Sequence, residues 1–258
     1  MDKPFLDKLR KIDPYVPGEQ PKTADIIKLN ANENPYPPAP GVTEALRTFD
    51  AAKLAIYPDA NAKALKTAIA ERFDLQPSQV FLGNGSDDVL ALAFQSFFCS
   101  DKPILYPDIT YSFYPVWCDL FRIPYENMPL DEDFCVNVRD YDKPNGGIVL
   151  PNPNAPTGRG VTLEFLEDLL QHNQDCVEAY VDFGAQSAVP LLGKYENLLI
   201  VQTTSKSRSL AGMRIGYALG SETLISTLEA VKNSYNSYTM DAIALAVGEA
   251  SIRDEDYF

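Results

Sequence analysis

Short apolar runs that alternate with amphipathic stretches restrict the fold of this chain more than any other feature. Buried strands are predicted at 80–82, 104–106, 147–150, 179–183, 198–201 and 215–219. Apolar residues at helical spacing predict helices near 42–49, 62–73, 86–98, 112–120, 162–172, 221–232 and 240–253. Strands of this kind are buried on both faces. We therefore expect an α/β fold with a mixed, mostly parallel sheet and helices on both faces.

The first 40 residues have a different character. The run from Asn30 to Pro38 is so rich in asparagine and proline that neither a regular helix nor a central strand fits it. We expect residues 1–40 to form an extended arm that lies on the rest of the chain. Residues 41–258 would then form the main domain.

Charge and composition narrow the function classes. The chain has 258 residues, with 22 Lys and Arg against 36 Asp and Glu, and a net charge of −14. Such a surface repels polyanions, so nucleic acid is not an expected partner. No apolar run is long enough to cross a bilayer, and the N-terminus lacks the apolar core of a signal peptide. We expect a cytoplasmic protein without membrane contact.

Cysteine and histidine usage argues against two further kinds of site. The four cysteines form no Cys-x-x-Cys pair, and His172 is the single histidine. A histidine-based metal cluster is therefore not expected, and a nucleophile–His–acid triad would have to use His172. We predict no metal site.

A glycine-rich turn follows the first predicted strand. Residues 83–88 read Gly-Asn-Gly-Ser-Asp-Asp, and Ser86 is a good helix-capping residue. Helix N-termini offer free N–H groups and partial positive charge, which suit a phosphate. A simple strand-to-helix turn is the alternative, because short glycine motifs are common.

Two further segments follow predicted strands. The Pro- and Asn-rich loop at 151–158 should lie at the carboxyl edge of the sheet, where open α/β sheets bind ligands, although it could also be an ordinary turn. In the segment 205–214, Lys206 could be partly desolvated, with a lowered pKa. The hydroxyls around it, together with Arg208 and Arg214, suit a phosphate dianion. A solvated basic loop is the alternative.

Taken in order, these segments resemble one family. They are Leu-Asn-Ala-Asn-Glu-Asn-Pro at 29–35, Tyr-Pro-Asp at 57–59, the glycine turn at 83–88, Pro-Asn-Ala-Pro-Thr-Gly at 153–158, Glu-Ala-Tyr-Val-Asp-Phe at 178–183 and Ser-Lys-Ser-Arg-Ser-Leu-Ala-Gly-Met-Arg-Ile-Gly at 205–216. The chain is similar, from about residue 4 to its end, to the histidinol-phosphate aminotransferase family. These are class II pyridoxal 5′-phosphate (PLP)-dependent aminotransferases of fold type I.

The resemblance implies a cofactor site. Lys206 would hold PLP as a Schiff base and later act as the base that moves the substrate proton. Ser205 and Arg214 would hold the phosphate, together with the backbone N–H groups of Ser86 and Asp87. These matches predict that the large domain of a fold-type I enzyme binds the cofactor.

Further matches concern the ring, the substrate and the subunit partner. Tyr111 matches the aromatic residue that stacks on the pyridine ring, and Tyr180 the residue that hydrogen-bonds the 3-hydroxyl group, for which Asn154 is a second candidate. Tyr57 matches a residue that reaches the neighbouring subunit's site, which implies a homodimer. Asn32 on the arm is a plausible substrate contact.

The resemblance also implies the reaction. An amino group would pass between a phosphate ester, L-histidinol phosphate, and the 2-oxo acid 2-oxoglutarate in histidine biosynthesis. The nearest alternative is an aromatic-amino-acid aminotransferase, and a more distant one is a PLP-dependent decarboxylase of phosphorylated threonine. A PLP-binding or merely structural fragment without activity is the alternative from another class.

The chain departs from the family pattern in three places. Val177 stands where the family has an aspartate beside the pyridine nitrogen, and Glu178 is a poor substitute because adjacent strand residues point to opposite faces. Ala155, rather than asparagine, precedes Pro-Thr-Gly. The C-terminal small domain, which carries an arginine for the substrate carboxylate, is expected to be absent. We therefore expect stronger cofactor binding than turnover.

Overall fold

The computed structural model describes residues 6–21, 26–173, 177–180 and 185–258. Within these ranges, seven strands form one sheet in the order β1-β7-β6-β5-β4-β2-β3. The strands are β1 (Val80–Asn84), β2 (Ile104–Pro107), β3 (Tyr125–Met128), β4 (Ile148–Pro151), β5 (Val177–Tyr180), β6 (Leu198–Thr203) and β7 (Ile215–Gly220). Only β7 is antiparallel to its neighbours, β1 and β6. The predicted mixed, mostly parallel sheet is confirmed.

Helices connect the strands close to the predicted positions. They are α1 (Pro40–Thr48), α2 (Lys63–Phe73), α3 (Ser86–Phe97), α4 (Phe113–Phe121), α5 (Leu163–His172), α6 (Glu222–Asn233) and α7 (Ala242–Arg253). Short 3₁₀ helices lie at Leu6–Lys8, Ala51–Ala55, Pro77–Gln79, Val138–Tyr141, Val189–Leu191 and Ala211–Met213. The hydroxyls of Thr162 and Ser221 cap α5 and α6, which explains why those two helices begin where the sequence predicts.

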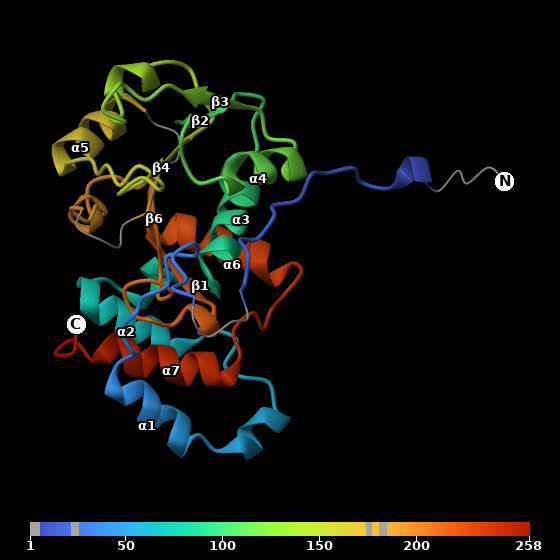
Figure 1. Ribbon diagram of the computed structural model, residues 1–258, viewed down its shortest axis with the longest axis vertical. Coiled ribbons are helices and arrows are strands. Elements are labelled where there is room, and N and C mark those ends of the chain that lie inside the picture. Colours follow the sequence, from blue (N-terminus) through green and yellow to red (C-terminus); the bar gives the residue numbers. More distant parts are fainter. Residues whose placement is uncertain (1–5, 22–25, 174–176, 181–184) are drawn as a thin grey trace.

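Apolar side chains form one core cluster on each face of the sheet. Along β1, Val80 and Leu82 belong to one cluster and Phe81 to the other, as the two-residue period of a strand requires. Helices α1, α2, α5 and α7 cover the first face, and α3, α4 and α6 cover the second (Figure 1). Both faces of the sheet are therefore buried, as expected for an α/β fold.

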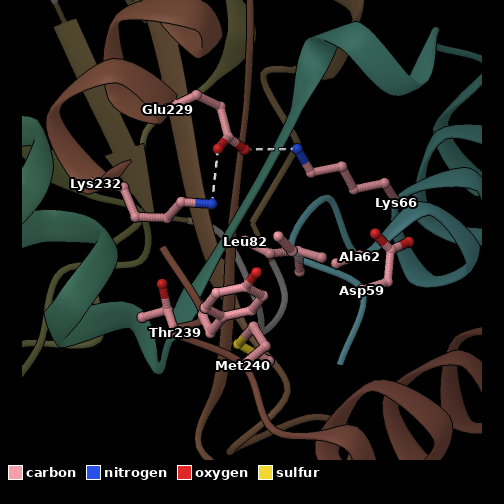
Figure 2. A pocket seen from close by; sticks show the side chains of 10 residues that line it. Asp59, Ala62, Lys66, Leu82, Glu229, Lys232, Thr239 and Met240 are labelled. Carbon is pink, nitrogen blue, oxygen red and sulfur yellow. Dashed lines mark hydrogen bonds and ion pairs between the residues drawn. The ribbon is translucent and has the colours of Figure 1, made fainter. Parts of the chain in front are cut away.

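A group of mostly buried charged side chains lies beside β1, at one edge of the sheet. Lys66 on α2 and Lys232 on α6 both point at Glu229 on α6, with N–O distances of 2.6 and 2.7 Å (Figure 2). We call these three residues the α2–α6 cluster. Because α2 and α6 cover opposite faces, the cluster ties the two layers together beside β1, the edge strand.

Two strands differ from the sequence expectation. The strand predicted to begin at 179 begins at Val177 and is described as far as Tyr180, and residues 181–183 of the predicted strand lie outside the described residues. Strand β3 was not predicted at all. Three of its four residues are exposed, so it lacks the apolar run that indicates a buried strand.

The N-terminal arm contains no helix or strand between residues 26 and 39. Its earlier part runs past α4, where the Tyr15 ring stacks on Phe113 at 4.2 Å between centroids and Arg10 donates to the carbonyl of Leu120. The segment before these contacts, with the 3₁₀ helix Leu6–Lys8, projects away from the body of the molecule (Figure 1). Among the described helices, none is long and apolar enough to cross a membrane.

Candidate functional site

Strand register brings the predicted site segments to one edge of the sheet. Asn84 pairs with Ile215, Thr203 with Gly216, and Tyr180 with both Pro151 and Val201. The segments that begin at 85, 152 and 204 therefore leave the sheet at the same edge. This is the carboxyl edge of the parallel strands, where ligands bind in open α/β sheets.

The glycine turn at this edge depends on close backbone packing. Gly85 adopts a φ of 87° and is the N-cap of α3. Ser86 is the first helical residue and its side chain makes no capping bond, so its predicted role as cap is wrong. The carboxylate of Asp88 instead accepts from the Asn84 backbone N–H at 2.8 Å. A Cβ at Gly216 would overlap the backbone of Gly85 and Ser86, so β7 and the turn require glycine on both sides.

Asp87 links the turn to two other predicted residues. Its carboxylate accepts from the Tyr111 hydroxyl at 2.8 Å and pairs with the Arg214 guanidinium at 3.3 Å. We call Asp87, Tyr111 and Arg214 the edge cluster. The side chains of Asp87 and Arg214 are 40% and 46% exposed, so a ligand can reach them. A Cβ at Gly85 would overlap the Arg214 guanidinium, which shows how closely this cation approaches the helix N-terminus.

The Tyr111 ring, just before α4, packs against aromatic side chains of that helix. Its centroid lies 5.6 Å from that of Phe113 and 5.7 Å from that of Tyr114, the latter with the rings nearly perpendicular. Perpendicular and tilted contacts of this kind stabilise a fixed ring orientation. The ring and the hydroxyl of Tyr111 are therefore both held by neighbours.

Ser205 lies two residues after the end of β6 and is buried. Its backbone N–H donates to Thr203 Oγ1 at 3.1 Å, and the two hydroxyl oxygens are 2.9 Å apart. Thr203 therefore orients Ser205. The sequence prediction missed Thr203, although its position two residues before Ser205, at the end of a strand, was a usable signal.

Lys206 contacts the N-terminal arm. Its Nζ donates to the carbonyl of Ala31 at 2.6 Å, and Asn34 Nδ2 donates to the backbone carbonyl of Lys206 at 3.0 Å. Asn32 is exposed beside Ala31, with a φ of 53°. Asn34 was not predicted, because a contact across 172 residues leaves no local signal in the sequence.

Asn154 is buried in the Pro-rich loop. Its Nδ2 donates to the Ile109 carbonyl at 2.8 Å and to Thr157 Oγ1 at 3.2 Å, and its Oδ1 accepts from Thr110 at 2.8 Å. Both N–H groups of its amide are thus engaged, and the loop is tied to the segment just before Tyr111. A direct bond from Asn154 to a cofactor oxygen would require one of these contacts to be released.

Three further residues that the sequence singled out lie outside these contacts. Arg208, expected near a phosphate, turns its guanidinium to Ser251 and Glu255, so that expectation is wrong. Tyr57 is 77% exposed and stacks on Tyr238 at 4.4 Å between centroids. Tyr180 is described through its backbone, at the carboxyl edge in β5.

The closed cavity of the α2–α6 cluster does not compete for a cofactor. Besides its three charged residues, it is lined by side chains that include Asp59, Leu82 and Met240 (Figure 2). Its volume is about 10 Å³, which suits roughly one water molecule. The carboxyl edge of the sheet is therefore the better ligand site.

Comparison with known sequences gives one family. Residues 24–257 match the family model described as aminotransferase class I and II. A histidinol-phosphate aminotransferase of Acinetobacter baumannii (strain SDF) is 55% identical over 258 residues, which covers 97% of this chain and 72% of that protein. A histidinol-phosphate aminotransferase 2 of Dechloromonas aromatica is 54% identical with the same coverage.

Solved structures show the same fold. The histidinol-phosphate aminotransferase of Sinorhizobium meliloti, in complex with pyridoxal 5′-phosphate, matches with a TM-score of 0.78 and 23% identity over 88% of this chain and 64% of that one. The enzyme of Clostridium acetobutylicum matches with a TM-score of 0.78 and 20% identity over 88% and 70%.

Proposed function

This chain belongs to the class I and II aminotransferase family, and we propose that it transfers an amino group from L-histidinol phosphate to 2-oxoglutarate with PLP as cofactor. Relatives of that name, at 54–55% identity, support the choice of amino donor. The structural observation that carries the proposal is the meeting of Lys206, Ser205 and the edge cluster at one sheet edge. The cytoplasmic location inferred from the sequence remains part of the proposal.

The residues at the edge fit PLP at its phosphate and aldehyde ends. Arg214 lies against Gly85 at the N-terminus of α3, in a space that any Cβ at position 85 would fill. A helix N-terminus, an arginine and the hydroxyl of Ser205 together form a donor set for a phosphate dianion. Lys206 would hold the aldehyde carbon, and Tyr111 would lie against the ring.

The protein would supply orientation and one proton carrier. When bound, PLP supplies an electrophilic carbon and an electron-withdrawing ring. Lys206 would hold the aldehyde end of the cofactor and, as a free amine, would accept and return the proton of the substrate Cα. The Ala31 carbonyl lies within hydrogen-bond distance of Lys206 Nζ and would help to keep that amine near the arm. Asn32, next along the arm, would contact the substrate.

The fit is weaker at the ring nitrogen. Val177 is the first residue of β5 and pairs with Ile148 and Leu198, whereas Tyr180 pairs with Pro151 at the carboxyl edge. Valine cannot bind a protonated nitrogen as a carboxylate does. This position favours a second candidate, a chain that captures PLP but transaminates slowly.

A homodimer is part of the proposal. Tyr57 and Tyr238 form an exposed stack, and Leu54, Ile56 and Tyr235, which are near them in sequence, are exposed as well, with exposed fractions of 46–77% across the five residues. Contiguous exposed apolar side chains mark interaction surfaces. Tyr57 would reach the site of the second subunit. Sedimentation velocity of the wild type and of Tyr57→Ser measures the oligomeric state, and a monomeric wild type would contradict the homodimer.

Two measurements test the function. PLP should turn the protein yellow, and borohydride reduction followed by mass spectrometry should locate the adduct on Lys206 and be lost in Lys206→Ala. Single-turnover assays then compare L-histidinol phosphate with aromatic amino acids as donors. Conversion of aromatic donors alone would favour the aromatic-amino-acid enzyme. Capture of PLP without conversion of any donor would favour the slow or inactive fragment.

A further inference from the structure

Arg208 is a buried cation only two residues after Lys206. Its residue is 5% exposed in a chain of net charge −14. Burying a guanidinium costs free energy unless its N–H groups are paired. The partners of Arg208 therefore decide how firmly this part of the chain is held.

All the described partners lie in one short segment, residues 251–258. Arg208 Nη1 donates to the carbonyl of Ser251 at 2.5 Å, and Nη2 pairs with Glu255 Oε1 at 2.9 Å. The guanidinium carbon lies 3.8 Å from the centroid of the Phe258 ring. A planar fork that bonds two acceptors and stacks on an aromatic face is a geometry that arginine provides and lysine does not.

The same segment contacts the N-terminal arm. The Tyr257 hydroxyl donates to the Pro37 carbonyl at 2.7 Å, and on the arm Asn34 Nδ2 donates to the Lys206 carbonyl at 3.0 Å. Glu255 also pairs with Arg72 of α2. The Lys206 loop, the arm and residues 251–258 therefore each contact the other two, and Arg208 makes the contact between the loop and residues 251–258.

We propose that Arg208 is a positioning residue that fixes the Lys206 amine by clamping its loop to residues 251–258, a role that rests on the proposed function of Lys206. Two peptide units separate the two side chains, so a shift at Arg208 is transmitted to the backbone at Lys206. A misplacement of about 1 Å can cost roughly 10²-fold in rate when it reaches a reacting group.

The test uses the PLP-loaded full chain with Arg208→Met and Arg208→Lys. We expect Arg208→Met to weaken PLP binding, to shift the pH midpoint of the visible absorbance band and to slow borohydride trapping by about 10²-fold. Arg208→Lys should restore part of the shift, because it keeps the charge but loses the fork and the stacking. Glu255→Gln leaves Arg208 in place and should shift the midpoint less, in the same direction, even where Arg208→Met folds poorly.

Arg72→Met is the matched control. It removes the other cation on Glu255 without touching the Lys206 loop, so it should lower the melting temperature but leave the pH midpoint unchanged. If Arg208→Lys and Glu255→Gln both keep the wild-type midpoint, PLP affinity and trapping rate, the positioning role is overturned, whatever happens to the melting temperature. A wild type that shows no visible band at all overturns the proposed function and this role together.

Discussion

The α2–α6 cluster and the edge cluster contain the same kinds of groups in different surroundings. Each joins a carboxylate to a cation from a segment more than 120 residues away in sequence. In the α2–α6 cluster the three side chains are 6–23% exposed. In the edge cluster the carboxylate and the guanidinium are 40% and 46% exposed. The two clusters therefore differ in hydration rather than in chemistry.

Hydration decides what each cluster can do. Burial opposes the charge of Glu229, but hydrogen bonds from Lys232 and Lys66 outweigh that effect and lower the pKa of its carboxyl. Removing one partner from such a buried group leaves charged side chains that are neither paired nor hydrated. The exposed pair of Asp87 and Arg214 can exchange partners at little cost, which is what binding an anionic cofactor requires. One cluster stabilises the fold and the other remains available to a ligand.

The largest effect should come from Glu229→Gln. The change leaves Lys232, which is buried, and Lys66, which is partly buried, with no carboxylate between them, and the free energy of unfolding should fall by about 3 kcal/mol, the lower end of the range for buried pairs. Urea unfolding measures it. Glu249→Gln, which breaks the exposed pair with Arg253, is the control and should change it by no more than about 0.5 kcal/mol. Equal losses of unfolding free energy in both variants would show that burial does not determine how much each ion pair stabilises the fold.

The next effect should appear in binding rather than in stability. Arg214→Gln removes a charge-assisted contact to the phosphate and should weaken PLP binding by about 10–100-fold, while stability changes by less than about 1 kcal/mol. Arg253→Gln is matched to it, because Arg253 is 45% exposed and pairs with Glu71 away from the sheet edge. Absorbance titration with PLP should give Arg253→Gln the same PLP affinity as the wild type. A similar loss in both variants would remove the phosphate role of Arg214.

The sequence predicted the place of the edge cluster in the sheet, but not every residue role in it. The glycine turn and Lys206 follow mostly apolar strands and Arg214 directly precedes another, so the edge they share follows from the strand order of an α/β sheet. The cap of α3 was misassigned because the turn needs the positive φ of Gly85, which outweighs the capping preference of Ser86. Local propensity therefore located the turn but not the residue that makes it.

Contacts that join distant segments could not be predicted. Lys66 and Glu229 are separated by 163 residues, and each looks like an ordinary surface charge on an amphipathic helix. The same holds for Asn34, which contacts the Lys206 backbone, and for Arg208, whose burial depends on residues 251–258. Only the packing of α2, α6 and α7 around the sheet edges brings these groups together.

A pH series sharpens the comparison through Glu229. Its folded-state pKa lies below the unfolded value, so its stabilising effect is complete above about pH 4.3 and is lost as the pH falls through the folded value. The stability difference between the wild type and Glu229→Gln should be constant from pH 5 to 7 and narrow in more acid solution. This change is smaller than the full substitution, because a protonated carboxyl keeps a hydrogen bond. Urea midpoints of both proteins at each pH measure it, and a difference that widens in acid would reverse the assigned sign.

The smallest effect tests how far the α2–α6 cluster extends. Asp59, which lines its cavity, accepts from the backbone N–H groups of Lys63 at 2.9 Å and Asn61 at 3.0 Å, and these bonds, that from Lys63 first, lower the pKa of its carboxyl. Asp59→Ala removes the side-chain acceptor for the backbone N–H of Lys63, the first residue of α2, and should cost about 1 kcal/mol without changing PLP affinity.

Lys66 lies one turn beyond Lys63 on α2, and its charge also lowers the pKa of Asp59. Without Glu229, the attraction to Asp59 stabilises a larger share of the positive charge of Lys66. A double-mutant cycle of Asp59→Ala and Glu229→Gln should therefore show a coupling of about 0.5 kcal/mol or more, with the pair losing more than the sum. Simple additivity would confine the cluster to Lys66, Glu229 and Lys232, with the hydrogen bond from Lys63 to Asp59 as an independent contribution to the fold.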